Sequence, residues 1–315
     1  MSEESSLFPL GLPDREQPEF FARLLWFGQF IEENCRRNCQ FDLNNWPNPV
    51  WQALARKLFL GLEDFSKTKP EPGQVVILQW YNSGILVKTP EQVLGFDLVP
   101  IPRYYCWPDE MGLTGLLAEV IDVLFVTHNH ADHFDAELIK ECNRLKRPVF
   151  MHPQAVPADL SDIGKFPDQA SIRIGQTRVK AHHGRHVWRS LAEEVATSGF
   201  EVELAGGFRF VFCGDLDYTV GLTNVSAEPD AFFITWRNPG PAFEDGHPEQ
   251  RGNTVDAVNI AIEQVKPRMI VLEHYAELDH VYHGFSASYE LALQLIRSLP
   301  VKTEILFWGD KLALS

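Results

Sequence analysis

Residues 123–135 read VLFVTHNHADHFD. The first four residues are apolar and β-prone, so they predict a buried strand, and the polar residues after them predict a loop at its carboxyl end. This loop holds His128, His130, Asp132 and His133 within six residues, although the whole chain has only 11 histidines. Neutral imidazoles and carboxylates are good ligands for zinc and similar metals. The segment therefore predicts a metal site at the end of a strand.

The spacing inside this loop divides the four side chains into two pairs. His128 and His130 are two residues apart, so in extended backbone they point the same way. Asp132 and His133 are adjacent and point in different directions. The second pair could therefore serve a second metal ion.

Further candidate ligands follow other apolar strands. A single histidine after a strand is more often a surface or core residue than a ligand, so each segment alone says little. Together they supply enough donors for two metal ions. The candidates are His182, His183 and His186 after the predicted strand 178–181, Asp215 after the predicted strand 208–212, and His274 after the predicted strand 269–273.

In this order the motifs resemble the signature of the metallo-β-lactamase fold hydrolases, over about residues 74–315. The version THNHADHFD is similar to the branch that includes L-ascorbate-6-phosphate lactonases and N-acyl-phosphatidylethanolamine phospholipase D. Segments 80–85 and 95–97 resemble the opening hairpin of that branch, but Tyr81-Asn82 stands where many relatives carry Gly-His. The resemblance implies an α/β fold, a four-layer αββα sandwich.

The resemblance also implies a set of metal ligands. Lys180-Ala181-His182-His183 aligns best with the family pattern when His183 is the ligand, although His182 and His186 compete for that place. The implied ligands are His128, His130 and His183 for the first ion, Asp132, His133 and His274 for the second, and Asp215 as the bridge between them.

A binuclear metal-dependent hydrolase is the function that this ligand set implies. A metal-bound hydroxide would attack a carbonyl or phosphoryl centre, with Asp132 as the catalytic residue that orients or deprotonates the water. Two divalent ions are expected, with zinc favoured and manganese or iron as alternatives. A histidine at position 130 favours hydrolysis, because redox di-iron proteins of this fold tend to have glutamate there.

Residues around the ligands are candidates for supporting roles. Asp97 and Asp135 could accept hydrogen bonds from the ligand imidazoles and so fix their tautomers, although Asp135 also stands where a helix N-cap belongs. Arginines on the loops could grip a phosphate or carboxylate, or could be solvated. The candidate substrate-binding residues are Arg185, His186, Arg237 and Tyr275.

The expected substrate is a small-molecule ester, lactone or phosphoester, and anionic molecules are among the candidates. One alternative is a lipid-like phosphodiester, cleaved as in a phospholipase of the D type. An alternative from a different class is a non-catalytic protein that binds a metal or ligand on the same fold. The intact ligand set argues against this last alternative, since proteins of this fold that have lost catalysis usually lack some of the metal ligands.

Composition limits the possible partners and compartment. The chain has 28 basic and 43 acidic residues, a formal net charge of −15, which argues against nucleic-acid binding. Five cysteines without a C-x-x-C motif indicate reduced thiols. The first residues lack the pattern of a signal peptide, and no apolar run reaches the ~20 residues of a membrane helix. We expect a cytoplasmic protein without a transmembrane segment, and both a monomer and a homo-oligomer stay open.

The chain divides into two regions by sequence texture. Residues 1–73 form an N-terminal extension with predicted helices over 18–37 and 50–65, and their apolar stripes favour packing against the main domain or across a dimer. Residues 74–315 form the hydrolase domain, where short β-rich runs alternate with predicted helices over 135–145, 254–265 and 286–298. The β-rich runs predict two sheets in a sandwich with helices outside.

Overall fold

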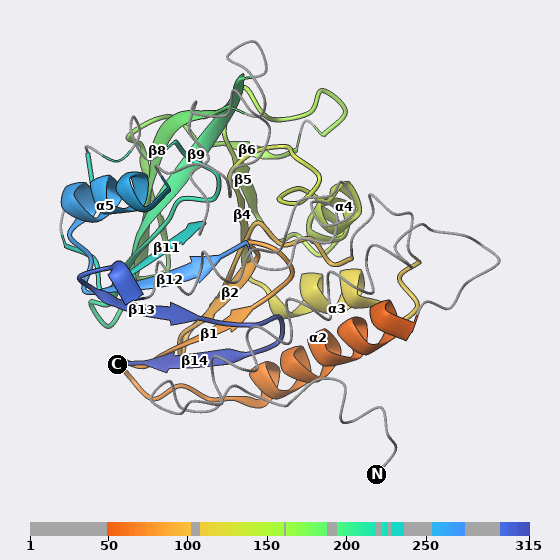
Figure 1. The fold of residues 1–315 in the computed structure, drawn as a ribbon. Helices are drawn as coiled ribbons and strands as arrows, with labels where there is room; N and C mark the ends of the chain where they lie inside the picture. Colours follow the sequence, from red (N-terminus) through yellow and green to blue (C-terminus); the bar gives the residue numbers. More distant parts are fainter. Residues whose placement is uncertain are drawn as a thin grey trace.

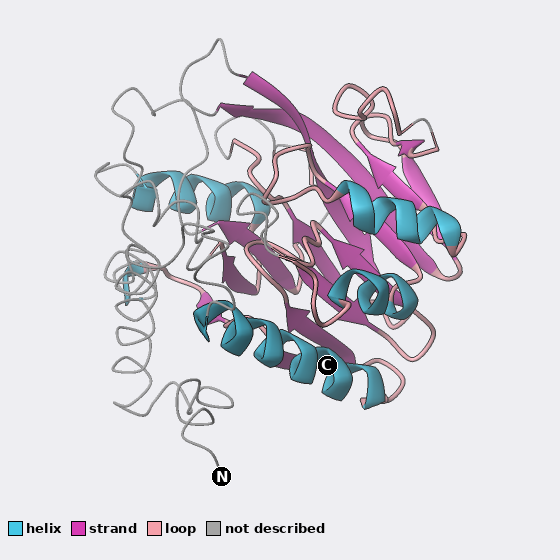
Figure 2. Ribbon diagram, turned by 90° about the vertical axis from the view of Figure 1, so that its right-hand side faces the viewer, coloured by secondary structure: helices cyan, strands magenta, loops and turns pink. Residues whose placement is uncertain are grey.

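The computed structural model describes residues 49–101, 108–160, 162–187, 194–217, 222, 224–225, 228–235, 254–274 and 297–315. Two seven-stranded sheets pack face to face, and helices lie on their outer sides (Figures 1 and 2). The four-layer αββα sandwich predicted from the sequence is confirmed.

The first sheet has the strand order β14-β1-β2-β3-β4-β5-β6. Strands β14 to β3 pair in antiparallel fashion, and β3 to β6 pair in parallel. As a result β3, β4 and β5 end at the same edge of the sheet. The strands are β1 (Val75–Gln79), β2 (Ile85–Lys88), β3 (Val93–Phe96), β4 (Val123–Val126), β5 (Val149–Met151), β6 (Gly164–Lys165) and β14 (Lys311–Leu314).

The second sheet has the order β13-β12-β11-β10-β9-β8-β7. Its first four strands are parallel, and β10, β9, β8 and β7 are antiparallel. Strands β10, β11 and β12 therefore share one carboxyl-terminal edge. The strands are β7 (Ser171–Ile174), β8 (Thr177–Val187), β9 (Glu194–Glu203), β10 (Arg209–Phe212), β11 (Ala231–Thr235), β12 (Met269–Glu273) and β13 (Lys302–Ile305).

Phenylalanine rings fill the space between the two sheets. Phe96 and Phe125 stack at 5.2 Å between ring centroids, and both contact Phe200 of the second sheet. All three side chains are fully buried. Each contributes about 1.5–3 kcal/mol of hydrophobic stabilisation. This rigid layer holds the edges of the two sheets together, where the polar loops meet.

Within the described residues, four helices cover the outer faces. Helices α2 (Pro49–Lys67), α3 (Leu113–Val120) and α4 (Ala136–Arg144) lie on the side of the first sheet, and α5 (Thr254–Val265) lies on the side of the second (Figure 1). The predicted helices over 135–145 and 254–265 are therefore confirmed. The predicted helix over 18–37 lies outside the described residues, as does most of the one over 286–298.

Helix α2 packs its apolar stripe against the first sheet. Leu54, Leu58 and Leu62 are at most 2% exposed and belong to the same hydrophobic cluster as the sheet residues. The ammonium of Lys57 donates hydrogen bonds to the Trp308 carbonyl at 2.7 Å and to Asp310 Oδ1 at 2.6 Å. The helix therefore belongs to the same core as the sandwich, while the boundary between residues 73 and 74 stays a prediction.

The β8–β9 hairpin and helix α3 differ from the prediction. The predicted strand over 178–181 is only the first part of β8, because residues 182–187 continue the strand and pair one by one with residues 194–199. Polar residues at these positions hide the strand alternation in the sequence. Helix α3 is not predicted from the sequence, since eight residues give too short a pattern to recognise.

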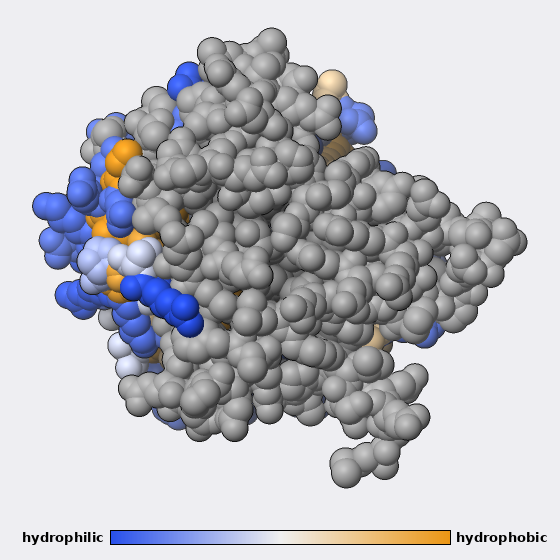
Figure 3. Space-filling model, viewed as in Figure 1, coloured by the Kyte–Doolittle hydropathy of each residue, from blue (hydrophilic) through white to orange (hydrophobic). Residues whose placement is uncertain are grey.

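The described surface carries few large apolar side chains. Among the described residues only Leu60 and Ile260 are exposed large hydrophobics, at 40% and 38%. Over α5 the described surface is mostly hydrophilic, with apolar atoms between the polar side chains (Figure 3). Within the described ranges, no helix combines the length and the apolar character needed to span a bilayer.

Gly61 of α2 provides a test of this packing. A Cβ at Gly61 would lie 2.6 Å from the Gly309 carbonyl oxygen, so alanine would push α2 away from the loop between β13 and β14. Gly61→Ala should lower the free energy of unfolding by about 1–3 kcal/mol, because overpacking outweighs the gain of ~1 kcal/mol in helix propensity. Urea unfolding measures the change.

Gly115 of α3 is the matched control, since a Cβ there has no neighbour within 4 Å. Gly115→Ala should raise the free energy of unfolding by up to about 1 kcal/mol. If Gly61→Ala stabilises the protein as much as Gly115→Ala does, α2 is not tightly packed on the loop between β13 and β14.

Candidate metal centre

Three histidines form the first group of candidate metal ligands. His128 and His130 follow β4, and His186 is near the end of β8. One ring nitrogen of each lies within 4.8 Å of the others. The ring centroids of His128 and His130 are 4.5 Å apart, and those of His130 and His186 are 5.0 Å apart. This spacing suits three imidazoles that converge on one ion.

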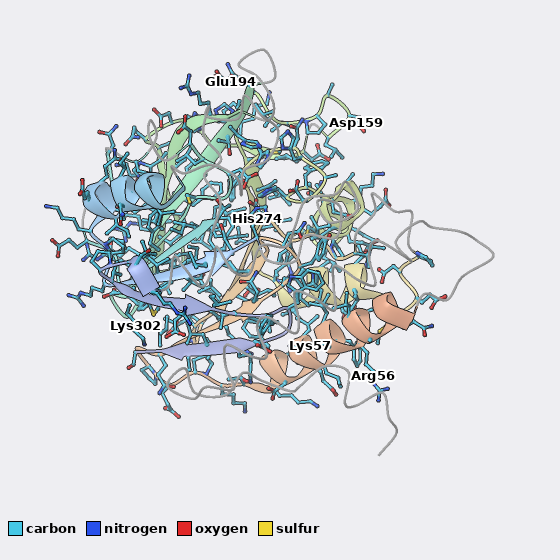
Figure 4. All side chains as sticks on the ribbon, in the orientation of Figure 1. Arg56, Lys57, Asp159, Glu194, His274 and Lys302 are labelled. Carbon is cyan, nitrogen blue, oxygen red and sulfur yellow. The ribbon has the colours of Figure 1, made fainter. Side chains whose placement is uncertain are left out.

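Two carboxylates and two histidines form the second group: Asp132, His133, Asp215 and His274. Asp132 and His133 lie in the turn after β4, Asp215 follows β10, and His274 follows β12. His274 lies near the middle of the molecule at the end of β12 (Figure 4). The group therefore takes its members from the carboxyl ends of strands in both sheets.

Asp215 lies between the two groups. Its Oδ2 is 3.4 Å from His186 Nε2 and 3.5 Å from His133 Nε2, and its Oδ1 is 3.1 Å from His274 Nε2. One carboxylate thus reaches the ligand nitrogens of both groups. A carboxylate in such a position is suited to be shared between two groups of metal ligands.

The carboxylate of Asp97 orients histidines of both groups. Asp97 follows β3, and its Oδ2 accepts a hydrogen bond from His133 Nδ1 at 2.7 Å. The same oxygen accepts one from Thr127 Oγ1 at 2.7 Å, and that hydroxyl is 2.9 Å from His128 Nδ1. Ser83 Oγ lies 3.1 Å from His133 Nδ1. These contacts engage the Nδ1 atoms and leave the Nε2 atoms for another partner.

The free nitrogens are buried. His128 and His133 are fully buried, and their Nε2 atoms have no hydrogen-bond partner within the part of the chain that the structure describes. Leaving a buried polar atom without a partner costs about 1–3 kcal/mol. A bound cation would remove that cost, so these atoms fit a metal site.

The backbone is strained at the centre. Asn82, Asp97 and His274 have φ values of 52°, 44° and 65°. Positive φ is uncommon for residues other than glycine and concentrates at functional sites. Gly214, which precedes Asp215, also has a positive φ of 49°, and a Cβ there would lie 2.8 Å from Thr127 Oγ1. The sandwich therefore holds these loops in one specific geometry.

The histidines of the first group are poor bases. Burial lowers the pKa of His128 well below its usual range, and the neighbouring His133 and His130 lower it further. Burial also lowers the pKa of His130, and it lowers the pKa of His186 to about 4. These imidazoles are neutral at pH 7, which is the form that binds metal ions.

Carboxylates determine the electrostatic environment of the second group. Burial lowers the pKa of His133, but the charges of Asp132, Asp215 and Asp97 outweigh burial and hold this pKa well above its usual range. Burial raises the pKa of Asp215, but His274 and His133 outweigh it and hold the pKa of that carboxyl well below its usual range. The group is therefore an anionic environment suited to a cation.

His183 is not part of either group, so its predicted role as a ligand needs correction. Residues three apart on a strand face opposite sides, and β8 runs through both His183 and His186. His183 Nε2 lies 2.7 Å from the Phe166 carbonyl, and its ring is 4.0 Å from that of His152. His182 is also elsewhere, with Nε2 2.8 Å from Glu201 Oε2. His186, predicted as a substrate contact, takes the place beside His128 and His130.

The other predicted residues fall into three cases. Asp135 caps α4, where its Oδ1 accepts a hydrogen bond from Leu138 N at 2.8 Å. Arg185 faces the buried Asp217, with Nε 3.4 Å from Oδ2. Arg237 and Tyr275, predicted to bind substrate, lie outside the described residues.

Three buried polar residues at the centre are not predicted from the sequence. Thr127 and Ser83 connect the histidines to Asp97, and a hydroxyl beside the first ligand histidine is the signal that could have indicated Thr127. Glu273 is 1% exposed, and burial, with Asp97 and Asp215 nearby, raises its pKa well above its usual range. Nothing in the local sequence distinguishes Glu273 from a surface glutamate.

A profile of the family described as a beta-lactamase superfamily domain matches residues 106–275, more than half of the chain. The chain belongs to the beta-lactamase superfamily. The matched segment contains all seven clustered residues, of which His274 lies just inside its end.

Individual members of the superfamily are similar at lower identity. A metal-dependent hydrolase of Polynucleobacter asymbioticus is 25% identical over 71% of this chain and 75% of its own. A metallo hydrolase from Ignicoccus hospitalis matches with a TM-score of 0.54 at 15% identity, over 77% of this chain and 99% of its own. A metallo-beta-lactamase fold protein from Bacillus subtilis has a TM-score of 0.53 at 14% identity, over 76% and 98%. The two structures share the fold.

The choice between His186 and His183 is testable by substitution. His186→Gln should weaken the binding of at least one metal ion by about 10-fold or more, because it removes one of three nitrogen donors. His183→Gln should leave metal affinity within about twofold of the unsubstituted protein. Isothermal titration of the metal-free protein with Zn²⁺ measures both. The opposite ranking would restore His183 as the ligand.

Asp97 should control metal affinity without touching the ion. Asp97→Asn removes the charge that orients His133 and, through Thr127, His128, and it should weaken metal binding by about 10–100-fold. Asp135→Asn is the matched control, since asparagine also caps helices well. Equal affinity in the two variants would mean that Asp97 has only a structural role.

Proposed function

We propose that this chain is a binuclear metal-dependent hydrolase. The observation that carries the proposal is the position of Asp215, whose two carboxylate oxygens lie 3.1–3.5 Å from histidine nitrogens of both groups. One ion would be held by His128, His130 and His186, and a second by Asp132, His133 and His274, with Asp215 shared. This set replaces His183 by His186 and keeps every other ligand predicted from the sequence.

The donor set supports divalent metals of the first transition row. It contains imidazoles and carboxylates but no thiolate, which suits zinc and also accommodates manganese or iron. When bound, such ions lower the pKa of a coordinated water from about 15.7 toward ~7 and polarise the bond to be cleaved. Zinc is the first choice because three neutral imidazoles and one shared carboxylate supply nitrogen and oxygen ligands of the kinds that zinc binds in proteins.

Asp132 is the proposed catalytic residue. Its side chain is 15% exposed, whereas that of His133 beside it is fully buried, so the carboxylate is within reach of an incoming molecule. Its Oδ2 lies 3.6 Å from His133 Nε2. From this position Asp132 would orient the attacking water and accept its proton, while the histidines stay fixed by Asp97.

The proposed substrate is a small-molecule ester, lactone or phosphoester. Supporting this class are the resemblance to the branch with L-ascorbate-6-phosphate lactonases and the hydrolase relatives of the chain. A lipid-like phosphodiester is the alternative within the same chemistry. The complete donor set argues against a protein that has lost catalysis and only binds a ligand.

Metal loading and hydrolysis test this proposal together. Protein purified without chelator, or reconstituted with Zn²⁺ or Mn²⁺, should carry close to two ions per chain by elemental analysis. It should cleave a panel of chromogenic esters, lactones and phosphodiesters, and dipicolinate should abolish the activity until metal is restored. His130→Ala should lose both metal and activity.

Asp132→Asn separates catalysis from binding, because the amide keeps an oxygen ligand but is a poor proton acceptor. It should retain at least one ion and lose about 10²–10⁴-fold in rate. If the unsubstituted protein carries its full metal content but hydrolyses no substrate class, the alternative of a non-catalytic binding protein is favoured. Absence of metal after reconstitution would contradict the proposal.

A further inference from the structure

We propose that Arg185 and Asp217 form a positioning pair that holds His186 against Asp215 and so fixes the distance between the two metal groups. The inference rests on the proposed function, because it assigns a role toward the same two ions. It also replaces the role predicted for Arg185 from the sequence, in which its guanidinium grips an anionic substrate.

The chain positions show why such a pair is needed. His186 is on β8 and Asp215 follows β10, and these two strands are not neighbours because β9 lies between them. No ladder hydrogen bond therefore sets the distance of 3.4 Å between His186 Nε2 and Asp215 Oδ2. Some other contact must connect the end of β8 to the loop after β10.

Arg185 and Asp217 make that connection at two points. Arg185 immediately precedes His186, and Asp217 is two residues after Asp215. The Asp217 amide donates a hydrogen bond to the Arg185 carbonyl at 2.9 Å, and Arg185 Nε donates one to Asp217 Oδ2 at 3.4 Å. Backbone and side chain of the same two residues thus connect the segments that carry a ligand of the first group and the shared carboxylate.

Burial gives the side-chain contact its strength. The Asp217 side chain is 0% exposed, whereas that of Arg185 is 32% exposed. Removing a cation that faces a buried carboxylate is destabilising, so we expect the loop after β10 to shift when Arg185 is replaced. Because Asp215 is two residues away, that shift would change its distance to His186.

The same contacts argue against a free anion-binding arginine. Arg185 Nη1 also lies 3.9 Å from Glu194 Oε2. Glu194 is at the outer end of the β8–β9 hairpin (Figure 4). Two carboxylates of this chain therefore face the guanidinium, and the charge that would attract a phosphate is largely compensated.

Removing the pair should change metal binding rather than substrate affinity. In Arg185→Gln and in Asp217→Asn the ions should bind at least about 10-fold more weakly, a size typical for groups that orient ligands. The double variant should be no weaker than the worse single variant, because both changes break one interaction. Arg185→Lys keeps the charge and should recover part of the affinity.

The experiment titrates each metal-free variant with Co²⁺ and records visible absorption and heat. Thermal unfolding of the metal-free proteins shows that each is folded. Asp122→Asn and Arg147→Gln are the matched controls, because Arg147 Nη1 and Asp122 Oδ1 form a similar pair at 2.9 Å near the start of β4, away from the centre. The control variants should match the unsubstituted protein in Co²⁺ affinity and spectrum.

Steady-state hydrolysis of bis-p-nitrophenyl phosphate and p-nitrophenyl acetate gives the second readout. If Arg185→Gln keeps the Co²⁺ affinity and spectrum but raises KM for the anionic phosphodiester alone, Arg185 grips substrate and the positioning role is wrong. Unchanged metal binding in both single variants would overturn it as well. If the unsubstituted protein binds no Co²⁺, the proposed function fails, and the positioning role fails with it.

Discussion

One buried carboxylate, that of Asp97, orients histidines on which both metal groups depend. It accepts hydrogen bonds from the Thr127 amide at 2.7 Å, from the Thr127 hydroxyl at 2.7 Å and from His133 Nδ1 at 2.7 Å. Because the Thr127 hydroxyl is also within 2.9 Å of His128 Nδ1, the charge influences one histidine of each group. This arrangement engages the Nδ1 atoms and leaves the buried Nε2 atoms of His128 and His133 for another partner.

The two sheets position Asp97 and Thr127 for the hydrogen bonds between them. Asp97 and Thr127 stand at the ends of β3 and β4, which are parallel neighbours, so the ladder itself brings them together. The Ser198 amide donates a hydrogen bond to the Thr127 carbonyl at 3.1 Å, which joins the second sheet to the same point. Below the loops, Phe96 and Phe125 of the first sheet both contact Phe200 of the second sheet, so the two sheets are packed together there. Local strain at Asp97 and His274 is tolerated because this core is rigid.

The sequence predicts the part of the centre that is local in the chain. His128, His130, Asp132 and His133 lie on one loop after a strand that is apolar throughout, so both the element and its donors are visible in thirteen residues. Asp215 and His274 also follow clear apolar strands. The third histidine of the first group depends instead on how far β8 extends, and its polar second half gives no strand signal.

The pairing of β8 with β9 decides between His183 and His186, a choice that the sequence leaves open. Had β8 ended at Ala181, His183 would lie in a loop that could turn toward the ions. The hairpin continues to Val187, and alternation then directs His183 toward Phe166 and His186 toward Asp215. The contact between Arg185 and Asp217 is equally invisible in the sequence, because it joins β8 to the loop after β10, and these two strands are not neighbours.

The most direct measurement is anomalous X-ray diffraction from crystals of the zinc-loaded protein. We expect two zinc peaks about 3.5–4 Å apart, with His186 bound to one ion, His274 bound to the other and Asp215 bound to both. A single peak, or a pair of ions that does not share Asp215, would contradict it.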